Sequence, residues 1–450
     1  MPRLNNESDL QYKQRILDTK SASFCGAKWY NSTIWLGSGM TTSCHHPLPH
    51  KVSVEEVQAN PAALHNTPKK KQERIMMQRG ERPSGCEYCW KIEDINKEAI
   101  SDRIYKSVIH SDQDLEHAFH DKTQKDFNLR TLEIAFDRTC QFACSYCNPA
   151  FSTSWVRDIT HNGPYTGLQS DGRNHFTHAH GSSQLYGPDD VNPYIEAFFK
   201  WWETDLQYSL KELRITGGEP LMSPHVWRIL EWFELNGSDI QFALNTNLGA
   251  KPEIIDRFIT HAKQIKNMHV YTSCEATGHM ANYIRDGMDF SQWTANMHRL
   301  ATEAKVKGLH VMSTINALCL WSLPDFLDWC LNFKMEYGRD YPTFTLNILR
   351  FPSFQSPLVL PLEIRLERAQ ALSDWYELHK NSELLHQMEL NHVKRLIDYL
   401  REVDSPHTGA SSPEQLAKDF KAFYNQYDVR RYKNRILDWP KQLRDWADSI

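Results

Sequence analysis

From about residue 130 onward, short β-rich runs alternate with stretches in which apolar residues recur at i, i+3 and i+4. This pattern predicts strands over 132–136, 212–216, 240–247, 268–275, 310–317 and 344–349. Between them it predicts helices over 194–206, 225–235, 252–265, 293–305 and 323–335. Strands that alternate with helices pair in parallel through right-handed crossovers. We therefore expect an α/β fold, barrel-like or open, with its chemistry at the carboxyl ends of the strands.

The flanking regions have different patterns. Residues 1–125 lack a sustained period and contain four cysteines, whereas the chain beyond 356 shows helical patterns only, over 362–379, 384–403, 413–427 and 435–449. The sequence thus predicts a small Cys-rich domain (1–125), an α/β domain (126–355) and a helical C-terminal region (356–450). The polar segment 150–192 is expected to be a loop that could cover a substrate. Its three histidines could be metal ligands or ordinary surface residues: His175, His178 and His180.

Charge and hydropathy exclude several classes of protein. The 450 residues contain 51 Lys and Arg against 56 Asp and Glu, so a dedicated binder of duplex nucleic acid is not expected. The longest apolar run without charges, 308–324, is interrupted by polar residues and proline, and the N-terminus has no apolar stretch of a secretory signal. We expect a cytoplasmic protein with no membrane partner. Residues 1–80 have 11 Lys and Arg against 6 Asp and Glu, which is typical of a solvated face and leaves an RNA contact open.

Ten cysteines in a cytoplasmic chain need a role other than disulfides, and three of them are closely spaced. Cys140, Cys144 and Cys147 follow the strand predicted at 132–136, in the pattern C-x3-C-x2-C. Three thiolates on one short loop can hold three irons of a cubane cluster and leave the fourth iron open. A structural zinc site would need a fourth ligand, and His161 is the nearest candidate. The spacing therefore favours an iron–sulfur cluster.

A second motif, Gly217-Gly218-Glu219-Pro220, directly follows the strand predicted at 212–216. Two glycines let the backbone approach a ligand closely, and the carboxylate can accept hydrogen bonds from an ammonium group. By itself such a motif is more often a tight turn. After a βα unit that begins with three clustered cysteines, it indicates a cofactor site.

With these two motifs the chain resembles the radical S-adenosylmethionine (radical SAM) enzyme superfamily. The resemblance implies a partial (βα)6 TIM-like barrel, in agreement with the six predicted strands. It implies that Cys140, Cys144 and Cys147 bind a 4Fe–4S cluster whose open iron chelates S-adenosylmethionine. Further cofactor contacts implied by the resemblance are Tyr146, Gly217, Gly218, Glu219, Pro220, Thr246, Asn247, Ser273 and Arg285.

Four of these positions have weaker support. Thr246 and Asn247 match a Thr-Asn-Gly turn loosely, because Leu248 precedes the glycine. Ser273 and Arg285 have the spacing of a pair that contacts ribose and carboxylate in peptide-modifying members. A helix cap or a surface ion pair is the alternative for both.

The remaining clustered cysteines are Cys25, Cys44, Cys86 and Cys89. A β-hairpin is predicted around Ile34 and Leu36, and the pattern Cys-x13-Gly-x4-Cys resembles SPASM and twitch domains, which hold auxiliary clusters. Four thiolates can ligate a 4Fe–4S cluster or a zinc ion, and the neighbouring radical SAM motif favours the cluster. In most relatives this domain follows the barrel, whereas here it comes first. His45 and His46 could compete as ligands, although ordinary loop histidines are more common.

The resemblance implies an enzyme that cleaves S-adenosylmethionine reductively to a 5′-deoxyadenosyl radical and abstracts hydrogen from a substrate. The expected substrate is a peptide or protein side chain, with a small molecule or RNA as alternatives, and the expected electron donor is a flavodoxin or ferredoxin. A non-catalytic iron–sulfur or zinc protein is the alternative from another class. The last three cysteines, Cys274, Cys319 and Cys330, are expected to be buried small hydrophobic residues.

Overall fold

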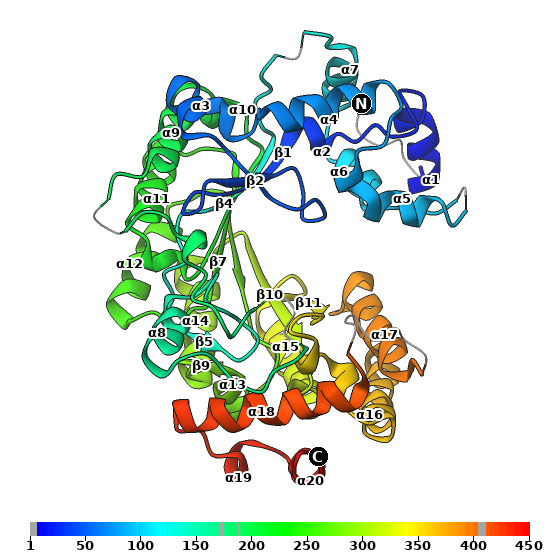
Figure 1. Ribbon diagram of the computed structural model, residues 1–450, viewed down its shortest axis with the longest axis vertical. Helices are drawn as coiled ribbons and strands as arrows, with labels where there is room; N and C mark the ends of the chain where they lie inside the picture. The colour runs from blue at the N-terminus through cyan, green and yellow to red at the C-terminus, as the bar shows by residue number, and fades with distance from the viewer. Residues whose placement is uncertain (1–6, 97, 124, 171–173, 188–189, 404–410) are drawn as a thin grey trace. The chain divides into compact units, whose positions relative to one another are not determined.

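The computed structural model describes residues 7–96, 98–123, 125–170, 174–187, 190–403 and 411–450 (Figure 1). The chain divides into two compact units. Unit 1 comprises Met1–Asp137, Gln184–Thr216 and Ile240–Phe242, and unit 2 comprises Arg138–Ser183, Gly217–Asp239 and Ala243–Ile450. These units cut the chain at other points than residues 125 and 355, and the expected three-domain division stays a prediction.

Five strands of unit 1 pair in the order β6-β4-β1-β2-β3. They are β1 (Asn31–Trp35), β2 (Met40–Thr42), β3 (His50–Lys51), β4 (Thr131–Ala135) and β6 (Glu212–Thr216). Strands β1 and β2 form the hairpin expected around Ile34 and Leu36, both fully buried. Strand β1 also pairs in parallel with β4, and β4 with β6. The Cys-rich N-terminal segment therefore adds its hairpin to the first two strands of the α/β pattern.

Short helices make up the rest of unit 1. Their bounds are α1 (Asp9–Tyr12), η1 (Lys13–Leu17), α2 (Ala27–Tyr30), α3 (Val54–Ala59), η2 (Pro61–Leu64), α4 (Pro68–Gln78), η3 (Ser84–Cys86), α5 (Glu87–Glu93), α6 (Asp102–Val108), α7 (Asp112–His120), α9 (Pro193–Trp201), η5 (Trp202–Leu206) and α10 (Gln207–Ser209). Most of those before α9 span fewer than ten residues, too few for a 3.6-residue period to stand out in the sequence. They pack around a core that includes Leu17, Trp29, Met77 and Trp90.

The parallel strands of unit 2 have the order β11-β10-β8-β7. They are β7 (Gln241–Thr246, which begins in unit 1), β8 (Met268–Thr272), β10 (Gly308–Ile315) and β11 (Thr343–Ile348). A separate antiparallel pair joins β5 (Ala143–Cys144) to β9 (Arg285–Asp286). With β4 and β6, all six predicted strands are present. The α/β class and the mostly parallel pairing are confirmed, and the closure of a partial barrel stays a prediction.

The helices between these strands are α8 (Thr153–Asn162), η4 (Gly181–Ser183), η6 (Pro220–Met222), α11 (Pro224–Asn236), α12 (Pro252–Ala262), α13 (Gly278–Ile284), α14 (Phe290–Arg299), η7 (Leu300–Ala304), η8 (Cys319–Trp321) and α15 (Leu323–Tyr337). Together with α9, they include all five predicted helices. Helix α8 lies in a segment that the sequence predicts as a loop. It buries only Trp155, Asp158 and Ile159, and two apolar positions are too few to predict a helix.

Beyond residue 356 the described residues of unit 2 contain no strand, as predicted. They form η10 (Pro357–Val359), α16 (Leu362–His379), α17 (Gln387–Arg401), α18 (Pro413–Arg431), α19 (Arg435–Asp438) and α20 (Lys441–Ser449), after η9 (Ser353–Gln355). Helix α18 runs alongside α13, β5 and β9 (Figure 1). Across the described helices, none combines the length and apolar character needed to cross a bilayer.

Candidate functional site

The three closely spaced cysteines lie on one loop of unit 2, residues 138–148, here called the cluster loop. The N-terminus of α8 holds this loop, because the hydroxyl groups of Thr153 and Ser154 donate hydrogen bonds to the Cys140 carbonyl. Burial raises the pKa of all three thiols, that of Cys147 to about 12, and the nearby Cys144 thiolate raises the pKa of Cys140 and Cys147 further. Three buried or half-buried thiols that resist ionisation become thiolates when a metal binds them. This donor set fits an iron–sulfur cluster with three protein ligands.

Nitrogen donors from two distant segments point at sulfur atoms of the cluster loop. The amide Nδ2 of Asn247, after β7, lies 3.9 Å from Cys140 Sγ, and Arg285 Nη1, in β9, lies 3.8 Å from Cys144 Sγ. The pairing of β5 with β9 places Arg285 directly opposite Cys144. The structure therefore brings two expected cofactor residues into contact with the expected cluster ligands.

The turn after β6 packs tightly under the same loop. Gly218 has no room for a side chain, because a Cβ there would lie 2.3 Å from the carbonyl oxygen of Thr139. The adjacent Glu219 donates its backbone N–H to that carbonyl. Gly218 is therefore required by the protein's own backbone, and its expected contact with the cofactor stays a prediction. Pro220 begins the turn η6 and is buried.

The carboxylate of Glu219 is 1% exposed and is bound by the end of β7. Oε1 accepts hydrogen bonds from Thr246 Oγ1 at 2.7 Å and Leu221 N at 3.1 Å, and Oε2 accepts one from Asn247 N at 2.7 Å. Burial raises the pKa of Glu219 to about 7, although these hydrogen bonds lower it in part. A carboxylate has about four acceptor positions, so one position remains for an additional donor such as an ammonium group.

Arg285 forms a buried ion pair that the sequence analysis missed. Its Nη2 lies 2.6 Å from Glu275 Oε2, and its Nε lies 3.1 Å from the same oxygen. Tyr146 completes the group: its hydroxyl donates to Glu275 at 3.2 Å, and its ring lies under the guanidinium with 5.6 Å to the centroid. Burial lowers the pKa of Arg285, but Glu275 and the other acidic groups outweigh this and raise it well above the usual value. Arg285 is therefore a fixed cation beside Cys144.

Glu275 lies two residues beyond Ser273, after the end of β8, and the signal available in the sequence was a single acidic residue in an otherwise uncharged stretch. Ser273 itself is different from the other expected residues. In the described part of the chain its hydroxyl has no hydrogen-bond partner, so its expected contact with the cofactor stays a prediction.

Helix α18 supports the cluster loop from outside the motifs. The Tyr427 hydroxyl donates to the carbonyl groups of Ala143 at 3.3 Å and Tyr283 at 3.2 Å. The Tyr424 hydroxyl lies 3.3 Å from Ser145 Oγ, and Gln355 Nε2 donates to the Ser145 carbonyl at 3.0 Å. These partners are separated by at least 144 residues along the chain, so no local pattern could predict them.

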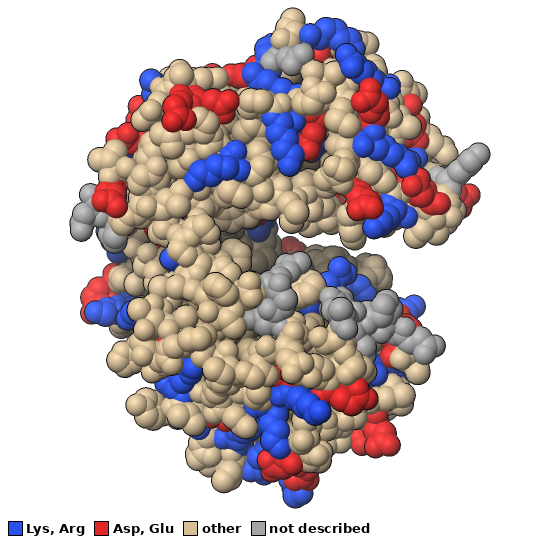
Figure 2. All heavy atoms as spheres, in the orientation of Figure 1, with Lys and Arg blue, Asp and Glu red and all other residues tan. Residues whose placement is uncertain are grey.

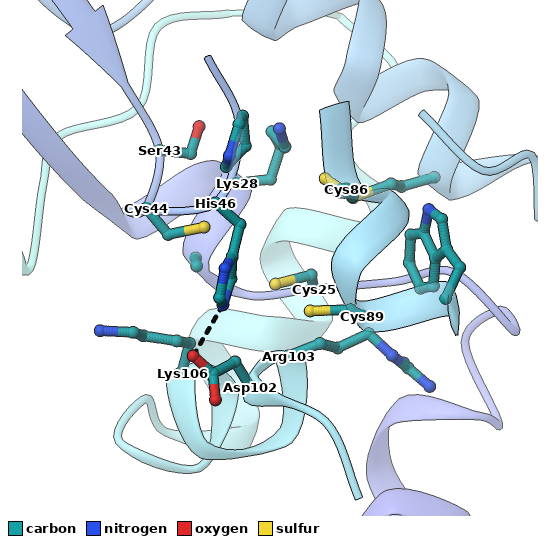
Figure 3. Close-up of a pocket in the computed structure, with 14 residues that line it drawn as sticks. Cys25, Lys28, Ser43, Cys44, His46, Cys86, Cys89, Asp102, Arg103 and Lys106 are labelled. Carbon is teal, nitrogen blue, oxygen red and sulfur yellow. Dashed lines mark hydrogen bonds and ion pairs between the residues drawn. The ribbon is translucent and has the colours of Figure 1, made fainter. Parts of the chain in front are cut away.

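In unit 1 the second set of cysteines surrounds one cavity (Figure 3). Cys25, Cys44, Cys86 and Cys89 all line it, and their sulfur atoms point toward the same space. Each is a free thiol whose pKa is raised, first by burial. Four thiols around one cavity fit a metal centre with four protein ligands, either a 4Fe–4S cluster or a zinc ion.

Cationic and imidazole groups complete the wall of this cavity, among them Lys28, Arg103 and His46. Lys28 forms an ion pair with Glu73 at 2.6 Å and lowers the pKa of Cys86. His46 Nε2 lies 2.8 Å from Asp102 Oδ2. The sequence analysis missed Lys28, Arg103 and Asp102, because single charged residues in short helices carry no motif.

The two histidines beside Cys44 form a small group of their own. Ligand atoms of His45, His46 and Asp102 all lie within 4.8 Å of one another, a spacing that could hold a metal ion. The histidines of the 150–192 segment form no such group among the described residues. There, His178 contacts Thr177 and His180 contacts Asn174, as surface residues do.

Several basic side chains of residues 1–80 are buried in the protein. Lys28, Lys70 and Arg74 are buried, and Lys70 Nζ donates to Ser32 Oγ and Thr41 Oγ1 at 2.9 and 2.8 Å. Figure 2 shows basic and acidic side chains interspersed over the visible surface. These three buried cations are unavailable to a nucleic acid, which removes much of the basis for an RNA contact. Cys274, Cys319 and Cys330 are fully buried, as predicted.

No family model matches the chain, and no curated protein matches it. Solved structures with similarity include Streptococcus suis SuiB bound to S-adenosylmethionine, at 12% identity and a TM-score of 0.35, over 77% of this chain and 69% of that one. Another is anSMEcpe with bound AdoMet, at 13% identity and a TM-score of 0.35, over 71% and 98% of the two chains. A third is SuiB bound to the precursor peptide SuiA, at 12% identity and a TM-score of 0.32, over 78% and 70%. These similarities are distant, and the chain's function has to be inferred from its own residues.

Proposed function

We propose that the chain is a radical SAM enzyme, with Cys140, Cys144 and Cys147 as ligands of a 4Fe–4S cluster. The observation that supports this most directly is the set of three buried or half-buried thiols with nitrogen donors aimed at two of their sulfur atoms. When bound, the cluster and S-adenosylmethionine would supply a 5′-deoxyadenosyl radical that abstracts hydrogen from a substrate. The partial (βα)6 barrel expected from the sequence is part of the same proposal.

The protein's own groups would stabilise the charge on the thiolates. Arg285 brings a permanent positive charge to Cys144, and Glu275 holds the guanidinium in place. Asn247, which follows β7, donates from its side-chain amide to the Cys140 sulfur. Hydrogen bonds and positive charge near sulfur favour the thiolate and the more negative state of a cluster, and therefore raise its reduction potential. Cys140 is buried and Cys144 and Cys147 are half-buried, which limits access of water and oxygen in part.

Glu219 would recognise the ammonium group of S-adenosylmethionine. Its carboxylate is oriented by Thr246 and Asn247, and among the described residues it forms no ion pair with a cation. An ammonium group bound there would stabilise the ionised carboxylate through a charge-assisted hydrogen bond. The remaining expected contacts, from Gly217, Pro220, Tyr146 and Ser273, belong to the same proposal.

The four cysteines of unit 1 would hold an auxiliary 4Fe–4S cluster, with zinc as the alternative. Full ligation by Cys25, Cys44, Cys86 and Cys89 suits electron transfer after hydrogen abstraction, because it leaves no iron open to a substrate. The SPASM-like spacing of these cysteines suggests a peptide or protein side chain as the substrate. A flavodoxin or ferredoxin would donate the first electron in the cytoplasm.

The test of the catalytic proposal is anaerobic. The protein is reconstituted with iron and sulfide and reduced with dithionite, and 5′-deoxyadenosine formed from S-adenosylmethionine is measured. We expect product from the wild type and from Cys330→Ala, a buried cysteine outside both sets, and none from the Cys140/Cys144/Cys147 triple alanine variant. Equal product from the triple variant and the wild type, or none from the wild type, would contradict the proposal.

Metal analysis of the same samples tests the auxiliary site. We expect about eight irons per chain in the wild type and about four after alanine replaces Cys25, Cys44, Cys86 and Cys89. About four irons together with one zinc in the wild type would reject the auxiliary cluster and leave the catalytic proposal intact.

A further inference from the structure

A second cavity in unit 1, of about 260 Å³, lies over one face of strands β1, β4 and β6. The pairing register places Thr33, Glu133 and Arg214 side by side across the three strands, and all three line the cavity. Side chains alternate between the two faces of a strand. The intervening residues Leu132 and Leu213 are fully buried, and although Leu132 and Ile109 also line the cavity, most of its lining residues are polar.

This polar face carries charges that are only partly compensated. Arg214 Nη2 donates to Glu212 Oε1 at 3.2 Å, and these two side chains satisfy each other in part. In contrast, among the described residues the Glu133 carboxylate and the Lys106 ammonium form no hydrogen bond or ion pair, either with each other or with another group. Burial raises the pKa of Glu133, while Arg214 and Lys106 lower it. Partly buried charges without partners cost stability and are characteristic of binding sites.

We infer that this cavity binds an amino-acid-sized zwitterion, with its ammonium group at Glu133 and its carboxylate at Lys106. The volume lies just below the roughly 300 Å³ at which ordinary ligand sites begin, so the occupant is small. Two groups of opposite sign, neither held in a direct hydrogen bond or ion pair among the described residues, match a ligand that carries both charges. A single cation or anion would leave one of the two groups unpaired.

The cavity also adjoins the four-cysteine site of the same unit. Cys44 and Lys106 line both cavities, and His45 lines the one proposed here. In Figure 3 the side chain of Lys106 extends away from Cys25, Cys86 and Cys89. A zwitterion held by Lys106 would therefore lie next to a ligand of the auxiliary metal centre and would not displace its thiols.

The same pair of charges could come from a free amino acid or from adjacent lysine and glutamate side chains of a peptide. The interpretation of this ligand as a substrate rests on the proposed radical SAM function. The binding of the ligand does not depend on that function, because binding requires neither S-adenosylmethionine nor reduction. A chain that binds zwitterions but forms no 5′-deoxyadenosine would retain the cavity proposal and lose the catalytic one, and the reverse result would do the opposite.

The experiment is isothermal titration calorimetry on the full-length reconstituted chain without S-adenosylmethionine. One arm uses pools of the free L-amino acids, and the other uses the blocked peptide N-acetyl-Lys-Glu-amide. We expect saturable binding in one arm, weakened roughly ten- to a hundredfold by Glu133→Gln and by Lys106→Met, because each removes a charge-assisted contact. Binding of free amino acids identifies the first source, and binding of the blocked peptide identifies the second.

The matched controls are Glu377→Gln and Lys380→Met, which remove the same charges from an exposed pair on α16. These controls should leave binding unchanged. The ligand-free Glu133→Gln chain should melt no lower than the wild type, because a partly buried carboxylate without a partner does not stabilise the fold. The inference is overturned if neither arm binds, if both variants bind like the controls, or if Glu133→Gln lowers the melting temperature by several degrees.

Discussion

Replacement of Glu275 by glutamine removes the negative charge from a pair that is almost completely buried. The side chains of Arg285 and Glu275 are 5% and 1% exposed, with 2.6 Å between Nη2 and Oε2. The variant keeps the shape of the residue but leaves the guanidinium without a counter-charge. Breaking a buried ion pair in this way costs about 3–5 kcal/mol. In a chain of this size that corresponds to a decrease in melting temperature on the order of 3–5 °C.

Thermal unfolding followed by circular dichroism measures the effect. The control is Glu303→Gln, which removes the carboxylate of an exposed pair with Arg299 and should cost at most about 1 kcal/mol. A double-mutant cycle adds Arg285→Met alone and Glu275→Gln together with Arg285→Met; the double variant lacks both charges and should recover part of the loss, with a coupling free energy of at least about 2 kcal/mol. The reasoning fails if Glu275→Gln melts like the control or if the two single effects simply add.

Three further changes have definite outcomes. Gly218→Ala places a Cβ 2.3 Å from the Thr139 carbonyl, so it should displace the cluster loop and lower the iron content per chain, whereas Gly181→Ala, with nothing within 4 Å, should leave iron content normal. Burial raises the pKa of Glu219 to about 7, so its stabilising contribution is complete below about pH 4.5 and disappears as the pH rises through 7. The free energy of unfolding of the ligand-free wild type should therefore fall by up to about 3 kcal/mol between pH 5 and 8. Glu219→Gln should reduce this decrease, and a variant with the same pH profile as the wild type would contradict the reasoning. Tyr427→Phe removes two hydrogen bonds to backbone carbonyls and should cost about 1 kcal/mol in unfolding, and a fully stable variant would show that α18 does not support the loop through this hydroxyl.

The strands and longer helices were predictable because each repeats its pattern over several residues. Strand β6 coincides with the predicted 212–216, and α15 shows the expected apolar face. Helix α8 and the short helices of unit 1 were not predictable, since so few apolar positions do not define a period. The parallel pairing of β1 with β4 was missed for a different reason. A hairpin sequence specifies its own partner but not the strand on its other edge.

The candidate site was predictable where its chemistry is local in sequence. The three cysteines of the cluster loop and the turn at Gly218 are short motifs, and their residue types indicated a cofactor. The expected cofactor contact of Gly218 stays a prediction, whereas its close approach to the Thr139 backbone could not be read from the sequence. Glu275 lay in a stretch already singled out for Ser273 and Arg285, but the ion pair depends on how the segment turns back after β8.

The cluster loop is supported by residues that lie outside its sequence motif. A loop that holds three buried thiols has to be rigid before a metal binds, because unsupported thiols would gain solvent access and lose their common orientation. In this chain the rigidity comes from three separate sources. Thr153 and Ser154 hold the loop at Cys140, β9 pairs with it at Cys144, and Tyr427 of α18 binds its backbone at Ala143. Only the first source is near the motif in sequence. The metal chemistry of the loop can therefore be inferred from 11 residues. The stability of the loop also depends on contacts with β9 and α18, which form only when these elements pack against it in unit 2.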